Sequence, residues 1–185
     1  MNETISSILE RRSNRGFEAK PLSDEQLDIL KQCALAAPTA MNAQSWHFSF
    51  VTNADIIKAV EDATLDELYA TADESTKQRI TSRGRTIFYG APLVVFISSD
   101  NDNYWSHIDA GIASENLAVA AQSMGLGSVI IGLCKKAFDC EKRAELEKLL
   151  CFPENHSFSI AVALGVPTAT KDAHPVMDGK LCVID

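Results

Sequence analysis

Apolar and polar residues alternate along this chain with two periods, one typical of strands and one typical of helices. From Trp46 to Val51 the alternation predicts a strand with one face in the core. The runs 93–97 and 127–131 consist of apolar or small residues, as in strands that are buried on both faces. Large apolar residues alternate with small ones over 158–164. We therefore expect a sheet of at least four strands.

Helical patterns fill the segments between these strands. A helix is expected over about 3–11, and a second one begins after Ser23, where Gln26 completes a capping box, and ends before Pro38. Further helices are expected near 54–64, 74–88, 107–124 and 141–150. The pattern alone leaves the fold class as α+β or α/β.

One of these helices is rich in alanine between Ala110 and Met124. Small side chains let another backbone approach closely, which suits a helix in the core or at a dimer interface. Ordinary helix propensity explains the same composition equally well.

Composition and charge narrow the class of protein. The formal net charge of −8 argues against a nucleic-acid surface, which needs basic residues to neutralise phosphates. No apolar run approaches the roughly 20 residues that cross a bilayer, and residues 1–10 lack the pattern of a secretory signal, so we expect a cytoplasmic protein without membrane contacts. The five cysteines are scattered, as expected of reduced thiols. No repeat or linker interrupts the chain, so one domain is expected over 1–185.

The densest basic cluster is Arg11-Arg12-Ser13-Asn14-Arg15, which Gly16 follows. Guanidinium groups donate forked hydrogen bonds to phosphate or carboxylate oxygens, and the Ser13 hydroxyl adds a further donor. The cluster therefore indicates an anion site. The alternative is that these arginines only favour the negative end of a helix.

A polar loop between a predicted helix and a predicted strand carries two carboxamides, Asn42 and Gln44. Each amide offers both a donor and an acceptor, which suits recognition of a heterocycle such as the imide edge of a flavin. Turn formation around Pro38 is the alternative.

Glycines lie around the strand at 127–131, and Gly132 ends it. Glycine there allows backbone N–H groups to approach a bound ring, although a tight turn explains it as well. Lys171 and Lys180 are candidate partners of a phosphate. No Walker loop, GxSxG elbow or HExxH motif is present and the four histidines are dispersed, so we predict no metal site and no catalytic side chain. A cofactor would have to supply any reactivity.

Five segments in this order resemble the nitroreductase family of FMN-dependent oxidoreductases over nearly the whole chain. Arg11–Arg15 is similar to the family motif RRSxR, and Ala37–Trp46 is similar to APSxxNxQPW. The supporting segments are 91–95, 109–127 and 165–167. Three features depart from the pattern: Thr39 replaces Ser, Ser45 replaces Pro, and the segment from about 62 to 90 is short.

The resemblance implies an α+β fold with a central mixed sheet of four to five strands between layers of helices, in an intertwined homodimer. It implies FMN sites at the subunit interface. Arg11, Arg12, Ser13 and Arg15 would contact the phosphate, ribityl chain and ring edge, while Thr39 and Asn42 would reach FMN from the partner and Gln44 would order their loop. The remaining predicted contacts are Pro38 in that loop, Ile131, Gly132 and Leu133 against the ring, and Lys180 or Lys171 at the phosphate.

The resemblance also implies the reaction. Hydride would pass from NAD(P)H through FMN to a small electron-poor acceptor such as a nitroaromatic, quinone or enone. The alternative is a flavin-binding module that acts as a store or sensor without turnover.

Overall fold

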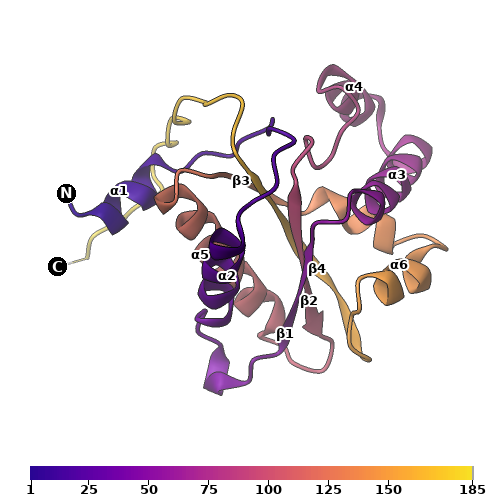
Figure 1. Ribbon diagram of the computed structural model, residues 1–185, viewed down its shortest axis with the longest axis horizontal. Coiled ribbons are helices and arrows are strands. Elements are labelled where there is room, and N and C mark those ends of the chain that lie inside the picture. The colour runs from indigo at the N-terminus through magenta and orange to yellow at the C-terminus, as the bar shows by residue number, and fades with distance from the viewer. Residues whose placement is uncertain (185) are drawn as a thin grey trace.

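The computed structural model describes residues 1–184, and its centre is one antiparallel sheet (Figure 1). The strands are β1 (Trp46–Val51), β2 (Leu93–Asp100), β3 (Gly127–Ile131) and β4 (His156–Gly165), in the order β1-β2-β4-β3. The expectation of at least four strands is confirmed. Both edge strands, β1 and β3, carry predicted site residues just before or after them.

The expectation of a mixed sheet is wrong for the described residues, because all three strand pairs are antiparallel. The helices between β1 and β2 return the chain to the end of the sheet that it left, since Val51 pairs with Val94. The connection from β2 to β3, which passes through α5 (Ser106–Ser123), makes β2 and β3 run in the same direction. However, β4 lies between them and pairs with both.

Helices cover both faces of this sheet, and the N-terminal helix packs against another helix rather than on the sheet. Their bounds are α1 (Glu3–Glu10), α2 (Asp24–Leu35), α3 (Ala54–Thr71), α4 (Glu74–Ser82), α5 (Ser106–Ser123) and α6 (Arg143–Leu149), with 3₁₀ turns η1 (Ala40–Asn42) and η2 (Leu133–Phe138). The capping box of Ser23 and Gln26 is present. The helix predicted over 74–88 ends early, because Gly84 and Arg85 adopt positive φ angles of 79° and 55°.

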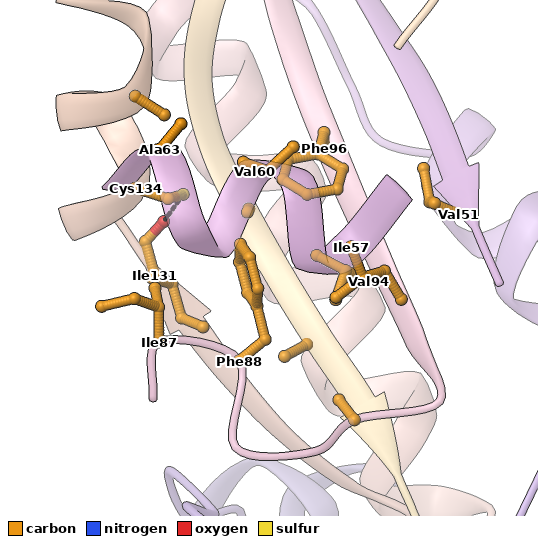
Figure 2. Packing of buried hydrophobic residues seen from close by; sticks show 14 of the residues in the cluster. Val51, Ile57, Val60, Ala63, Ile87, Phe88, Val94, Phe96, Ile131 and Cys134 are labelled. Carbon is orange, nitrogen blue, oxygen red and sulfur yellow. Dashed lines mark hydrogen bonds between the residues drawn. The ribbon is translucent and has the colours of Figure 1, made fainter. Parts of the chain in front are cut away.

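Two apolar cores make the molecule three layers thick. Leu30 of α2 and Leu117 of α5 pack with Val95 of β2 on one face. Val60 of α3 packs with Phe96 of β2 on the other, together with residues of η2 and α6 (Figures 1 and 2). The small residues of α5 are buried within the first core, which favours the close-packing explanation of its alanines: Ala110, Ala113, Ala118 and Ala121.

No helix described within residues 1–184 is both long enough and apolar enough to cross a membrane.

Candidate functional site

The arginine segment lies along the free edge of β3. Ser13 forms a parallel bridge with Ser128, and the Asn14 backbone N–H donates to the Ser128 carbonyl at 2.9 Å. The Asn14 side chain accepts from the Ser128 N–H at 3.2 Å and donates to the Ala169 carbonyl at 3.2 Å. Asn14 therefore joins the arginine segment, the edge strand and the C-terminal tail.

The arginines of this segment have different surroundings. Arg11 Nε lies 3.2 Å from Glu115 Oε1 of α5. Arg12 Nη1 donates to the carbonyls of Leu9 and Arg11, both at 2.8 Å. Arg15 is half-buried and forms no ion pair or side-chain hydrogen bond with any residue that the structure describes. Its charge is thus available to a ligand.

The structure brings Lys171, but not Lys180, to the arginine segment. Lys171 and Arg12 line one open pocket of about 410 Å³, together with Asn14 and Gly127. Lys180 lies in the exposed tail and does not line this pocket. Of the two predicted phosphate partners, this geometry favours Lys171.

The other end of β3 carries Ile131, Gly132 and Leu133. Ile131 packs beside Ile87 in the core that α3 covers (Figure 2). Gly132 is exposed and has an ordinary φ of −87°, and a Cβ there would meet no atom of the chain closer than 3.7 Å. Neither the backbone conformation nor the packing of the chain requires glycine at this position.

These features fit a cofactor that lies along β3. The Ser128 hydroxyl is buried and has no hydrogen-bond partner among the described residues, which leaves an unmet polar group beside the arginine segment. That hydroxyl is closed off from solvent, so its missing partner is a cost to the fold and not by itself a contact for a ligand. The exposed Gly132 suits contact with a ring, and the cations at the opposite end of β3 suit a phosphate.

The second predicted motif lies at the opposite end of the sheet. The Thr39 hydroxyl accepts from the Gln44 N–H at 3.0 Å, and Gln44 Nε2 donates to Asn42 Oδ1 at 3.1 Å, so these three side chains order the loop that Pro38 begins. This loop precedes Trp46, which pairs with Ser99 at the far end of β2.

Within one chain the two motifs are well separated. Ser128 pairs with Leu164, which pairs with Leu93, and the strand from Leu93 to Ser99 spans about 20 Å. Pro38, Thr39, Asn42 and Gln44 therefore do not join the arginines of their own chain.

Three of the four histidines, His47, His107 and His156, lie at the end of the sheet remote from Ser13. Burial lowers the pKa of His47, and the nearby His156 lowers it further. His107 Nδ1 lies 2.6 Å from the Ser159 hydroxyl, at the end of the sheet remote from Ser13. Residues 1–184 contain no group of three side chains that would hold a metal ion.

Sequence reasoning did not single out two residues that the structure places at the site, Asn14 and Ser128. Asn14 falls within the arginine motif, but its role depends on hydrogen bonds to Ser128 and Ala169, which are distant in the sequence. Ser128 lies in an apolar strand, and only the observed pairing shows that its hydroxyl has no partner. The serine within an otherwise apolar run was the available signal.

Three comparisons place this geometry among known proteins. Residues 8–166 match the model of the nitroreductase family. A putative NADH dehydrogenase/NAD(P)H nitroreductase of Archaeoglobus fulgidus is 30% identical over 96% of this chain and 93% of its own length. An NADPH-flavin oxidoreductase of Vibrio harveyi is 27% identical over 99% of this chain and 73% of its own. A crystal structure of a nitroreductase with bound FMN from Desulfitobacterium hafniense superposes with a TM-score of 0.96 at 34% identity, covering 100% of both chains.

Proposed function

Because this chain belongs to the nitroreductase family, we propose that it is an FMN-dependent oxidoreductase that takes hydride from NAD(P)H. The acceptor is a small electron-poor molecule such as a nitroaromatic, a quinone or an enone. The observation that carries this proposal is the site along β3, where the cationic segment, the pocket that Arg12 and Lys171 line, and the exposed Gly132 lie on one strand edge. A bound flavin supplies the redox chemistry, because its ring accepts and releases hydride.

The residues of this chain bind and orient the cofactor. Arg11, Arg12, Ser13 and Lys171 hold its phosphate and ribityl chain through charge-assisted hydrogen bonds. Arg15, which has no partner among the described residues, places its positive charge at the ring edge, where it stabilises negative charge in a partly dry site. Ile131, Gly132 and Leu133 lie against the ring. Hydride transfer between stacked rings requires no side-chain acid or base.

We further propose that the active species is an intertwined homodimer. Apolar side chains of α1 and α5 are exposed in the single chain, among them Ile8 at 51% and Ile108 at 53%. Exposed apolar surface of this kind is typical of a subunit interface. The loop with Pro38, Thr39, Asn42 and Gln44 then completes the site of the partner, which explains why it lies far from the arginines of its own chain. The exposed apolar tail, which includes Val176, is free to wrap the partner.

An absorbance scan of the purified protein from about 300 to 600 nm, followed by anaerobic addition of NADPH or NADH, tests the proposed reaction. We expect flavin bands that bleach when a reduced nicotinamide is added. Bands that neither donor bleaches would instead support a flavin store or sensor. A protein that shows no bands even after FMN supplementation would contradict the proposal.

A further inference from the structure

The turn over 101–105, which leads from β2 into α5, is attached to the loop over 38–45. At the end of β2, the Asp100 N–H donates to the Ser45 carbonyl at 3.0 Å. Within the turn, Asn103 Nδ2 donates to the Ser45 hydroxyl at 2.7 Å. The turn therefore sits on the loop that the proposed function assigns to the site of the partner.

A buried carboxylate of α5 holds the other part of this loop. Asp109 is only 3% exposed, and its Oδ1 accepts from the Ala40 N–H at 3.4 Å. Beyond that contact the loop is exposed, with positive φ angles of 52°, 54° and 50° at Met41, Asn42 and Gln44. Residues other than glycine rarely adopt such angles, and backbone strain of this kind is typical of segments that are ordered in advance to bind a ligand. The loop and the turn thus form one pre-ordered unit.

Two aromatic side chains of the turn project from this unit into solvent. Tyr104 is 83% exposed and Trp105 is 49% exposed, and their ring centres lie 5.0 Å apart with the planes at 87°. The Trp105 N–H donates to Asn103 Oδ1 at 2.9 Å, so the asparagine that binds the loop also fixes the backbone of this pair. These are the only exposed aromatic side chains of residues 1–184.

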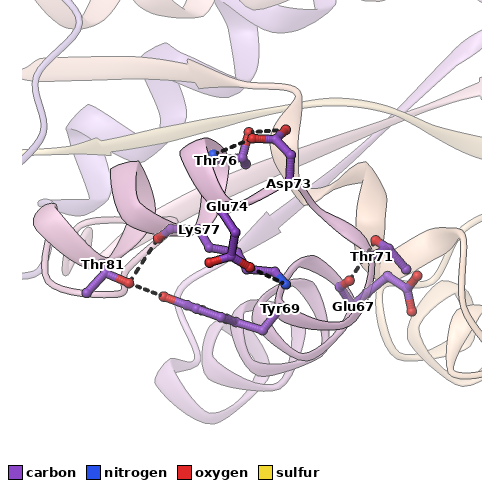
Figure 3. A network of polar contacts seen from close by, with 8 residues as sticks. All are labelled: Glu67, Tyr69, Thr71, Asp73, Glu74, Thr76, Lys77 and Thr81. Carbon is purple, nitrogen blue, oxygen red and sulfur yellow. Dashed lines mark hydrogen bonds and ion pairs between the residues drawn. The ribbon is translucent and has the colours of Figure 1, made fainter.

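Tyr69 is the opposite case, an aromatic ring with partners inside its own chain. Its hydroxyl lies 2.7 Å from the Thr81 hydroxyl (Figure 3), and the Arg85 guanidinium lies 4.6 Å from its ring centre. The packing of α3 and α4 therefore explains that ring. No described residue covers Tyr104 and Trp105 in this way, and large apolar groups left together in water are typical of binding surfaces.

The proposed homodimer gives these rings a location. Its loop over 38–45 reaches the cofactor of the partner, and the hydrogen bonds to Ser45 and Ala40 bring the attached turn to the same place. The two rings then lie beside the flavin of the partner, where the electron acceptor must bind. The faces of indole and phenol rings are electron-rich, so a planar, electron-poor ring is the molecule that stacks on them best.

We propose that Tyr104 and Trp105 bind the acceptor in the site of the partner by stacking, so that the protein prefers planar acceptors such as quinones and nitroaromatics to non-planar ones. This inference rests on the proposed function and on its homodimer. The two side chains take no part in the transfer of hydride itself. They determine which molecule is held against the reduced flavin.

The test compares the double variant Tyr104→Leu/Trp105→Leu with the wild type by anaerobic stopped-flow oxidation of the bound flavin. Dithionite reduces the flavin beforehand, so that no nicotinamide competes for the site. Menadione is the planar oxidant, and ferricyanide, an octahedral ion, is the oxidant that cannot stack. We expect the ratio of the second-order rate constants for menadione and ferricyanide to fall by about tenfold, because menadione binds more weakly. Tyr104→Phe/Trp105→Phe, which keeps two rings, should retain most of the ratio.

Tyr69→Leu is the matched control, because it removes a ring that lies outside the turn, and it should leave the ratio as in the wild type. Light scattering should show the same oligomeric state for the double variant and the wild type. Dissociation of the double variant would overturn the inference, because the rings would then serve the contact between subunits. An unchanged ratio, or an equal loss with both oxidants, would overturn it as well.

The same experiment separates this inference from the proposed function. If NAD(P)H bleaches the wild-type flavin and the double variant keeps its ratio, only the inference fails. If neither nicotinamide reduces the flavin, the proposed function fails, while oxidation of the dithionite-reduced protein still decides the inference. A wild type that binds no flavin contradicts both.

Discussion

The two glycines at the ends of β3 differ in what a side chain would meet there. A Cβ on Gly127 would lie 2.8 Å from the Asn14 side chain and 2.9 Å from Pro167. A Cβ on Gly132 would have Ile160 at 3.7 Å as its nearest neighbour. The packing of the chain itself therefore requires glycine at 127, whereas only a molecule outside the chain would require it at 132.

This difference separates a glycine that the packing of the chain requires from one that we propose to lie against the cofactor. Gly127→Ala should lower the free energy of unfolding by about 1–3 kcal/mol, because Asn14 and Pro167 must move. Gly132→Ala should change it by only about 0.5 kcal/mol, but should weaken FMN binding. Urea denaturation of the apoprotein and fluorescence titration with FMN measure the two effects. An unchanged FMN affinity in Gly132→Ala would remove that glycine from the site.

At the scale of elements, local signals predicted much of the fold. The capping box at Ser23 and the strand at 127–131 match the structure, because neighbouring residues determine both. The helix from Ala54 continues to Thr71 rather than Thr64, since tertiary packing of residues such as Leu68 extends it. The strand directions could not be predicted, because they depend on which strands meet across the whole chain.

The same limit applies to the candidate site. The RRSxR-like motif indicated the cations, but Asn14 and Ser128 acquire their roles only when the segment pairs with β3. Likewise, nothing near residues 86–88 in the sequence indicates that Glu61, on another element, satisfies their N–H groups.

The contacts of Glu61 give a prediction at this scale. Glu61→Ala leaves the N–H groups of Ile87 and Phe88 without a partner among buried residues, which should cost about 1–3 kcal/mol. The neighbouring Asp62 forms only an exposed ion pair with Lys58, so Asp62→Ala should cost at most about 0.5 kcal/mol. Thermal unfolding and hydrogen exchange of residues 86–90 would show the contrast. Equal effects of the two substitutions would mean that Glu61 does not hold residues 86–88.

At the scale of the whole molecule, the proposed homodimer explains both the exposed apolar residues and the separation of the two predicted motifs. A single chain presents the arginines at one end of its sheet and the loop of Thr39 and Asn42 at the other. In the proposed dimer, each site takes one motif from each subunit. Oligomeric state and FMN affinity should therefore depend on each other.

Ile108→Asp tests this dependence. The substitution places a charge on the exposed apolar face of α5, so the dissociation constant of the dimer should rise by about a hundredfold or more. Leu149→Asp is the control, because Leu149 is similarly exposed, at 40%, on α6 across the sheet. Light scattering over a dilution series and FMN titration would be measured together. A monomeric variant that still binds FMN as the wild type does would contradict a shared site.

The position of β4 between β2 and β3 has a consequence for synthesis of the chain. β4 spans residues 156–165, so the strand that joins the two halves of the sheet leaves the ribosome last of the four. Until then β3 lacks the strand that joins it to the rest of the sheet. Local pairing of β1 with β2 can precede this step, whereas the edge proposed to bind flavin depends on a contact made only after β4 has been synthesised.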